Sequence, residues 1–272
     1  MRETAYAKLN LALHVLGREP DGYHRLETIF AFAAEGDSLA VEASDELSLR
    51  VHGPFGAALH GEGDNLVLRA ARALQERFEV PRGAALALDK RLPVGAGIGG
   101  GSADAAAALR LLTRFWGIEA DREDLLAIAG RLGADVPACL GSRICRGTGR
   151  GDVLMPFEAP ELAGAPVLLV NPGVALPTAA VFGRWAGPGS GPLGDHLAAS
   201  ANDLEAPAIA LVPEIGEVLE ALGGLAGVRL ARMSGSGATC FALFGDEAGR
   251  DRAERSLAAD RPGWWRLSTC LR

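Results

Sequence analysis

The chain is poor in the residues on which disulfide-rich and zinc-binding proteins depend. Only four of its 272 residues are cysteines. They form no C-x-x-C pair and stand at no Cys/His spacing typical of zinc sites. We therefore expect reduced thiols in a cytoplasmic protein without a metal site built from its own side chains, and we assign no chemistry to Cys139, Cys145, Cys240 and Cys270.

A surplus of positive charge is missing as well. The formal net charge of −7 and the pI of about 5.3 argue against a sequence-independent nucleic-acid partner and against an anionic membrane surface, because both require a basic face. A small anionic ligand in a local basic pocket is still allowed. The charge therefore predicts no nucleic-acid or membrane partner. We also expect a small-molecule substrate and a monomer or homodimer, although neither follows from the charge.

Long apolar runs are absent too. The N-terminal segment carries Glu3, Lys8 and Asn10 where a signal peptide needs an uninterrupted apolar core. No later segment holds enough consecutive apolar residues to span a bilayer. We expect the protein to stay in the cytoplasm.

The hydrophobic pattern indicates an α+β fold. Residues 7–15 alternate between apolar and polar side chains, as in a half-buried strand, which puts Lys8 and Asn10 on one face. Further strands are predicted at 28–33, 38–43, 47–51, 84–88, 166–170, 228–232 and 239–244, and a last one ends at Cys270. Helices are predicted over 65–78, 102–116, 122–132, 178–185, 213–222 and 246–258. Because these elements mix without strict βαβ alternation, a doubly wound sheet is disfavoured.

Two local signals refine this outline. Asp64 stands where it could cap the helix that begins at residue 65. Residues 156–166 contain prolines and glycine without periodicity, which is typical of a linker. We therefore predict two domains, residues 1–158 and residues 159–272.

One stretch has five glycines in seven positions and opens directly into a helix-forming run: Pro93-Val94-Gly95-Ala96-Gly97-Ile98-Gly99-Gly100-Gly101-Ser102-Ala103. Without Cβ atoms, backbone N–H groups can turn toward an anion, and a helix start adds unsatisfied donors and a positive dipole end. The stretch therefore predicts a phosphate-binding loop. Ser102 could cap the helix or present its hydroxyl to a metal bound to phosphate.

Other interpretations of this loop remain open. Three of its glycines also satisfy the dinucleotide pattern G-x-G-x-x-G, although Pro93 separates the preceding strand from the first glycine. No lysine follows the glycines, as a Walker loop would require. A turn that binds nothing is the third interpretation.

Several single residues have both a structural and a functional interpretation. Asp135 precedes a Val-Pro step, so it could be a helix cap or a general base, and Lys8 could be a solvated edge lysine or the cation beside that base. The segment Ser234-Gly235-Ser236-Gly237 could be only a hairpin turn. Residues 23–24, an aromatic ring beside an imidazole, suit loop packing or a planar ligand. Phe182 is most simply a core residue, and Pro177-Thr178 is most simply the cap of its helix.

Taken together, these residues resemble the GHMP kinases, the superfamily of galactokinase, homoserine kinase, mevalonate kinase and phosphomevalonate kinase. Its three motifs stand in order at residues 7–10, 93–103 and 233–238. Within the superfamily the pattern is similar to that of the kinases that act on 4-diphosphocytidyl-2-C-methyl-D-erythritol. Their signatures AKLNL, DGYH, DNL, KRLP, LGADVP and PG followed by PT and an aromatic residue match residues 7–11, 21–24, 64–66, 90–93, 132–137, 172–173, 177–178 and Phe182.

The resemblance implies a two-domain fold, with a mixed β-sheet and helices in the N-terminal domain and an α/β sandwich-like C-terminal domain. It implies ATP-dependent phosphorylation of the substrate's 2-hydroxyl, a step of the non-mevalonate isoprenoid route, with Mg²⁺ accompanying the ATP. By position, Asp135 would be the base and Lys8 its partner, and residues 93–103 would hold the phosphates. Asn65 and Lys90 would lie around the nucleotide. Tyr23 and Phe182 would sandwich the cytosine, His24 would read its polar edge, and Asn10 and Thr178 would contact the substrate.

The chain departs from the family pattern in two places. Ala103 stands where a second serine is usual, and Arg150 and Gly151 stand where an acidic residue commonly follows a glycine pair. Three other functions stay open: a sibling kinase acting on mevalonate or homoserine, a binding module without catalysis, and a nicotinamide-dependent oxidoreductase. Retention of both Lys8 and Asp135 argues against the binding module, because a binder needs neither.

Overall fold

A computed structural model describes residues 1–59, 65–194 and 196–272. These residues divide into two compact units, and neither unit is continuous in the sequence. Unit 1 comprises Met1–Lys8, Glu35–Val94 and Gly99–Ser142, and unit 2 comprises Leu9–Ala34, Gly95–Ile98 and Arg143–Arg272. The predicted boundary at residue 158 therefore stays a prediction about domains, and the two units are described separately below.

Two long strands run through both units, β1 (Arg2–Arg18) and β2 (His24–Glu42), and they pair with each other. In unit 1, the second half of β2 pairs antiparallel with β4 (Ala84–Asp89), and β4 pairs parallel with β3 (Leu47–His52). The strands predicted at 28–33 and 38–43 are thus two parts of the single strand β2.

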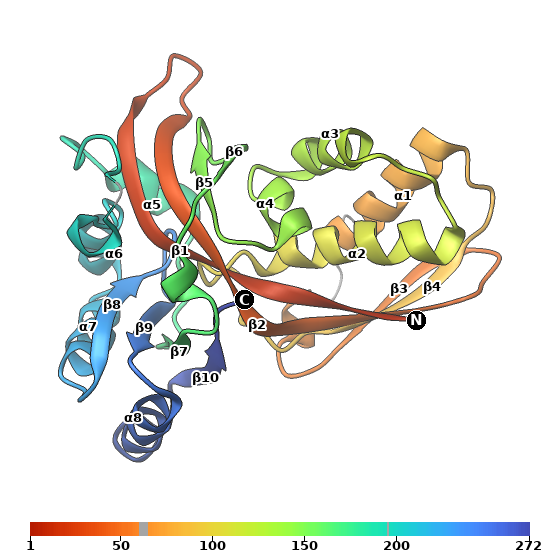
Figure 1. Cartoon of the computed structure of the whole chain (residues 1–272). Helices are drawn as coiled ribbons and strands as arrows, with labels where there is room; N and C mark the ends of the chain where they lie inside the picture. The colour runs from red at the N-terminus through yellow and green to blue at the C-terminus, as the bar shows by residue number, and fades with distance from the viewer. Residues whose placement is uncertain (60–64, 195) are drawn as a thin grey trace. The chain divides into compact units, whose positions relative to one another are not determined.

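The helices of unit 1 pack around α2 (Gly100–Trp116), with α1 (Leu66–Phe78), α3 (Arg122–Leu132) and α4 (Val136–Gly141) all in contact with it. Figure 1 shows these four helices side by side. A run of alanines makes α2 narrow, and most of its residues are buried, so neighbouring helices can approach from several sides. The short 3-10 turn η1 (Gly56–Leu59) completes the unit.

Helix starts differ slightly from the sequence expectation. Helix α2 begins at Gly100 with Gly99 as its N-cap residue, so the interpretation of Ser102 as the cap is wrong. Asp64, predicted to cap α1, lies outside the described residues. Asn65 caps α1 instead, since its Oδ1 accepts a hydrogen bond from Val67 N–H at 2.9 Å.

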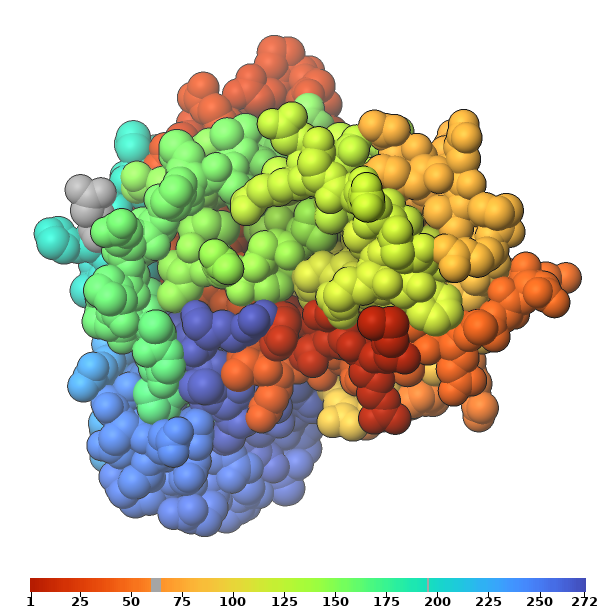
Figure 2. All heavy atoms as spheres, turned by 45° about the vertical axis from the view of Figure 1, so that its right-hand side comes forward, coloured from red at the N-terminus to blue at the C-terminus, as the bar shows by residue number. Residues whose placement is uncertain are grey.

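Unit 2 contains a four-stranded antiparallel sheet in the order β10-β7-β9-β8. These strands are β7 (Pro166–Asn171), β8 (Val228–Met233), β9 (Cys240–Phe244) and β10 (Trp265–Cys270). The helices of the unit are α5 (Thr178–Arg184), α6 (Glu205–Leu211), α7 (Glu214–Gly223) and α8 (Glu247–Asp260), with 3-10 turns η2 (Pro160–Leu162) and η3 (Leu197–Ala199). Helices α7 and α8 contact the sheet, and Figure 2 shows the C-terminal residues, in blue, gathered in one block.

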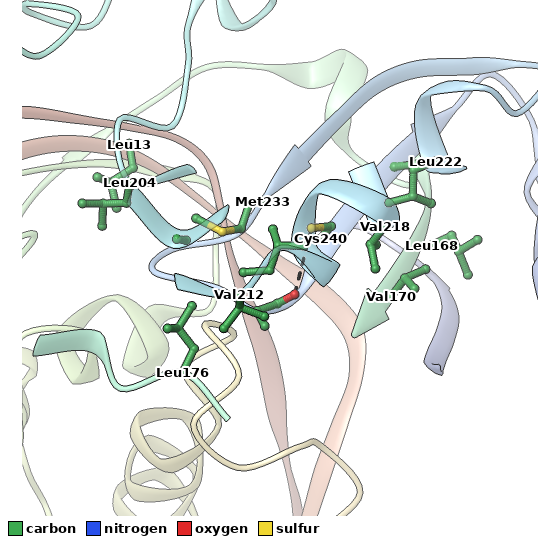
Figure 3. Close-up of a cluster of buried hydrophobic side chains, with 14 of the residues drawn as sticks. Leu13, Leu168, Val170, Leu176, Leu204, Val212, Val218, Leu222, Met233 and Cys240 are labelled. Atoms are coloured by element: carbon green, nitrogen blue, oxygen red, sulfur yellow. Dashed lines mark hydrogen bonds between the residues drawn. The ribbon is translucent and has the colours of Figure 1, made fainter. Parts of the chain in front are cut away.

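The first half of β2 also belongs to unit 2, where it pairs antiparallel with β5 (Cys145–Thr148), which pairs with β6 (Val153–Pro156). The hydrophobic core of unit 2 combines side chains from distant parts of the chain. Figure 3 shows Leu13 of β1 and Leu204 near Met233 of β8, with Leu168 and Val170 of β7 beside helix α7. The N-terminal strand is therefore part of the core that the C-terminal half builds.

The four cysteines are all free thiols, and two of them, Cys139 and Cys240, are buried. Burial raises the pKa of the half-buried Cys145 to about 11. Within the part of the chain that the structure describes, no helix combines the length and apolarity that crossing a bilayer demands.

Candidate functional site

The glycine-rich stretch forms a loop that leads into α2. Gly95, Gly97 and Gly99 have positive φ angles of 65°, 77° and 61°, a region that residues with a Cβ rarely adopt. No side chain caps the start of α2. Its first helical hydrogen bond runs from Ala103 N–H to Gly99 O at 2.8 Å, so three N–H groups precede the helical ladder at the positive end of the dipole. This is the geometry of an anion-binding site.

The first part of the loop, residues 95–98, is held by the turn between β8 and β9 of unit 2. Ser234 Oγ donates a hydrogen bond to Gly97 O at 3.0 Å, and Thr239 N–H donates one to Ala96 O at 3.1 Å. A Cβ on Gly97 would lie 2.5 Å from Ser234 O, so only glycine permits this approach. The third motif is thus a hairpin turn and also the support of the glycine loop.

The second part of the loop, in unit 1, lies against Lys8. A Cβ on Gly99 would come within 2.8 Å of Lys8 Cε. The Lys8 side chain is only 5% exposed, and its Nζ lies 3.0 Å from Oδ2 of Asp135, which is 35% exposed. Asp135 occupies the N-cap position of α4 but makes no capping hydrogen bond. Asp135 is therefore a cap by position but not by hydrogen bonding, and the interpretation of Lys8 as a solvated edge lysine is wrong.

Lys90 is buried beneath the start of α2 between two carboxylates. Its Nζ lies 2.5 Å from Asp37 Oδ2 and 2.7 Å from Asp104 Oδ2. The other Asp37 oxygen accepts hydrogen bonds from the N–H groups of Arg91 and Leu92, at 2.5 and 2.8 Å. The cluster thus joins the end of β4 to the first turn of α2, one segment on each side of the glycine loop.

Charge is unbalanced in this cluster, since two carboxylates meet one ammonium group. Burial raises the pKa of Asp104 to about 7, the charge of Lys90 opposes this, and the neighbouring Asp37 adds to it. The pKa of Lys90 is raised: burial lowers it, but the two carboxylates outweigh that effect. A proton retained by the buried Asp104 therefore neutralises the excess negative charge near neutral pH.

In unit 2, His24 lies within an aromatic cluster. Its ring centroid is 4.9 Å from that of Phe182 and 5.6 Å from that of Trp185, the latter in an edge-on arrangement. Burial, and then the positive charge of Arg18, lower the pKa of His24. A neutral imidazole has one nitrogen that donates and one that accepts, so this ring can read the polar edge of a planar ligand.

Tyr23 is 58% exposed and stacks under the guanidinium group of Arg150, whose Cζ lies 3.8 Å from the ring centroid. Asn10 is buried, and its Nδ2 donates a hydrogen bond to Thr28 Oγ1 at 2.7 Å. Thr178 Oγ1 lies 2.9 Å from Ser236 Oγ of the third motif. The predicted substrate residues therefore all belong to unit 2, and the predicted catalytic pair, Lys8 and Asp135, belongs to unit 1.

Three site features escaped the sequence interpretation. Trp185 beside His24, Asp37 beside Lys90 and Arg150 above Tyr23 are each brought to their partners by the tertiary fold. Asp104 could be recognised as a residue near the helix start, but its pairing with Lys90 could not. Among residues 1–59, 65–194 and 196–272, no three His, Cys, Asp or Glu side chains gather in a way that would hold a metal ion.

Residues 65–143 match the GHMP kinases N terminal domain, and residues 190–262 match the GHMP kinases C terminal domain. The chain is 58% identical to a 4-diphosphocytidyl-2-C-methyl-D-erythritol kinase of Rhizorhabdus wittichii, over 99% of this chain and 94% of that protein. It is 51% identical to the protein of the same name from Novosphingobium aromaticivorans, over 100% of this chain and 93% of that protein.

Solved structures give the same grouping. A crystal structure of 4-(cytidine 5'-diphospho)-2C-methyl-D-erythritol kinase superposes with a TM-score of 0.84 at 36% identity, over 100% of this chain and 99% of that chain. A homoserine kinase from Cytophaga hutchinsonii shares the fold, with a TM-score of 0.76 at 18% identity over 100% of this chain and 95% of that chain. The chain therefore belongs to the GHMP kinases and, within them, to the family of 4-diphosphocytidyl-2-C-methyl-D-erythritol kinases.

Proposed function

We propose that this chain transfers the γ-phosphate of ATP to the 2-hydroxyl of 4-diphosphocytidyl-2-C-methyl-D-erythritol, giving the 2-phosphate and ADP, in the non-mevalonate route to isopentenyl diphosphate. The observation that carries the catalytic part of the proposal is the Lys8–Asp135 pair, 3.0 Å apart, with the Lys8 side chain against Gly99 at the start of α2. A carboxylate, a cation and a helix N-terminus thus belong to one compact unit.

Asp135 has the role of general base in this proposal. Its carboxylate is partly exposed, so a hydroxyl group can reach it. The hydroxyl proton passes to Asp135 as the oxygen forms a bond to the γ-phosphorus, and the bond from that phosphorus to the β–γ bridging oxygen breaks. Lys8 positions the hydroxyl and offsets the negative charge that develops, while its own charge is balanced by Asp135.

The glycine loop holds the phosphates. The N–H groups that precede the α2 ladder supply donors without a side chain in the way, and the alternating positive φ angles of the loop open its backbone toward a ligand. Asn65 and Lys90 keep the elements around the nucleotide in place, as helix cap and as buried ion pair. A divalent cation such as Mg²⁺ would arrive with the nucleotide and neutralise charge between its β and γ phosphates.

The aromatic residues of unit 2 bind the cytosine. Tyr23 and Phe182 offer ring faces for stacking, and the neutral imidazole of His24 offers a donor and an acceptor. Asn10 and Thr178 contact the remainder of the substrate. The cytoplasmic location, the absence of nucleic-acid and membrane partners, and the monomeric or homodimeric state stay predictions.

The test measures ADP release by purified protein with Mg-ATP and each of three acceptors: the cytidine substrate, mevalonate and homoserine. We expect release with the cytidine substrate alone. Asp135→Asn should lower kcat by about 100-fold or more, the lower end expected for a positioned base. Asp45→Asn, which changes an exposed carboxylate elsewhere in unit 1, should leave kcat within twofold.

ADP release with mevalonate or homoserine but not with the cytidine substrate would reject the proposed substrate, while the assignment as a small-molecule kinase would stand. ATP binding without transfer to any acceptor would favour a binding module. Full activity of Asp135→Asn would reject the proposed base.

A further inference from the structure

Arg150, which the sequence marks as a departure from the family pattern, lies at the turn between β5 and β6 and covers one face of an aromatic ring. Its Cζ is 3.8 Å from the ring centroid of Tyr23. Tyr23 lies in the turn between β1 and β2, so the contact joins two turns that are about 130 residues apart in sequence. Figure 1 shows the β1–β2 turn at the end of the two long red strands.

Asp21 fixes both partners of this stack. Its Oδ1 accepts a hydrogen bond from Tyr23 N–H at 3.0 Å, and its Oδ2 pairs with the Arg150 guanidinium group. One carboxylate therefore positions the backbone below the ring and the cation above it. A planar guanidinium group held in this way stacks on a ring face more effectively than an ammonium group can.

The second turn is tied down as well. Arg150 N–H donates a hydrogen bond to Asp152 Oδ1 at 3.0 Å, and Leu26 N–H of β2 donates one to Gly149 O at 2.8 Å. The backbone on each side of the stack is thus anchored. The guanidinium group occupies one face of Tyr23, and the side chain is still 58% exposed. A planar ligand that stacks on Tyr23 has to use the opposite face.

We propose that Arg150 is a positioning residue for the cytosine end of the substrate: it holds the Tyr23 ring by stacking on one face, so that the other face is ready for the base. The inference rests on the proposed function and adds a residue to it. A fixed ring loses less conformational entropy when the base arrives, so removal of Arg150 weakens substrate binding and spares the transfer step. An exposed ion pair with no such role would contribute little to stability or binding.

The experiment compares steady-state kinetics of the wild type, Arg150→Met and Arg150→Lys. Methionine retains an apolar stem without the cation, and lysine retains the charge without the planar group. We expect Arg150→Met to raise KM for the cytidine substrate about 3- to 10-fold, with kcat and KM for ATP within twofold. Arg150→Lys should restore part of the loss.

Arg261→Met provides a matched control. Arg261 also lies over an aromatic ring, 5.4 Å from the centroid of Trp264, but neither residue is among the proposed substrate contacts. This variant should leave all three constants unchanged. A double-mutant cycle then tests the route of the effect: in a Tyr23→Leu background, Arg150→Met should raise KM no further.

The outcomes separate the two proposals. If the wild type does not use the cytidine substrate, the proposed function fails and the inference fails with it. If the wild type turns over but Arg150→Met leaves KM unchanged, changes both KM values equally, or adds fully to Tyr23→Leu, the role of Arg150 is rejected and the proposed function stands.

Discussion

Asp104 shows how a single buried carboxylate responds to an unbalanced cluster. Its pKa is raised from 3.8 to about 7, first by burial. Between these values the folded protein binds a proton that the unfolded chain has released, so this group makes stability fall as pH rises from about 4 to 7. The positive charge of Lys90 lowers this pKa, and the negative charge of the neighbouring Asp37 carboxylate raises it.

We predict that Asp104→Asn removes this contribution. The variant should become more stable relative to the wild type as pH rises from 5 to 8, because it has no carboxyl group to ionise at this position. Urea unfolding at intervals across that range measures the difference. Asp45→Asn serves as an exposed control, and its free energy of unfolding should change with pH as that of the wild type does. If the free energy of unfolding of Asp104→Asn also followed the wild type across this pH range, the raised pKa of Asp104 would be contradicted.

Lys8 is a second buried charged residue that has a carboxylate beside it. It is almost fully buried, and Asp135 lies 3.0 Å from its Nζ. Weakening one ion pair of a buried charge costs stability, so we expect Asp135→Asn to lower the stability of the fold as well as to slow the proposed proton transfer. Thermal unfolding of that variant, measured beside its kcat, separates the two effects.

At the scale of elements, the glycine loop depends on the hairpin turn between β8 and β9. Gly97 and Gly95 provide a matched pair to test this. Both have positive φ angles, 77° and 65°, but a Cβ on Gly97 meets the backbone of Ser234 and Gly237 at 2.5–2.8 Å, whereas a Cβ on Gly95 meets nothing within 4 Å.

We predict that Gly97→Ala raises KM for ATP by about 10-fold or more and lowers the unfolding temperature, because the loop has to leave its support. Gly95→Ala should show only the smaller cost of the strained φ, about 1–2 kcal/mol. Steady-state kinetics and thermal unfolding of both variants decide the matter. Equal effects would mean that backbone strain, and not contact with the turn, determines the requirement for glycine.

At the scale of the molecule, the core of unit 2 contains Leu13 and Val15 of β1 together with side chains between Leu168 and Leu257. A cut at the predicted boundary would separate them. We predict that residues 159–272, expressed alone, lack a cooperative urea transition, and that adding residues 1–158 in trans restores one. A cooperative transition of the isolated fragment would show that its core does not need β1.

The local patterns located elements better than they described burial. The alternation at residues 7–15 identified the strand β1, but residues on both of its faces are buried there, so the prediction of a half-buried strand is wrong. The glycine spacing identified the loop. Asp37 lies about 50 residues from Lys90, and Arg150 lies about 130 residues from Tyr23. No local periodicity encodes such pairs. The helix start moved from Ser102 to Gly100 because glycine at residue 99 adopts the left-handed cap conformation.

The division of β1 between the two units affects the order in which they can fold during synthesis. Leu13 leaves the ribosome early, yet its core neighbours extend to Leu257, so at roughly 5–20 residues per second the strand waits on the order of 10–50 s for them. During that time an apolar strand without its native neighbours is exposed on the nascent chain. All residues of unit 1, the last of which is Ser142, are synthesised well before Leu257. The nascent protein therefore passes through a stage in which all residues of unit 1 have been synthesised, while unit 2 has its first strand and lacks its four-stranded sheet.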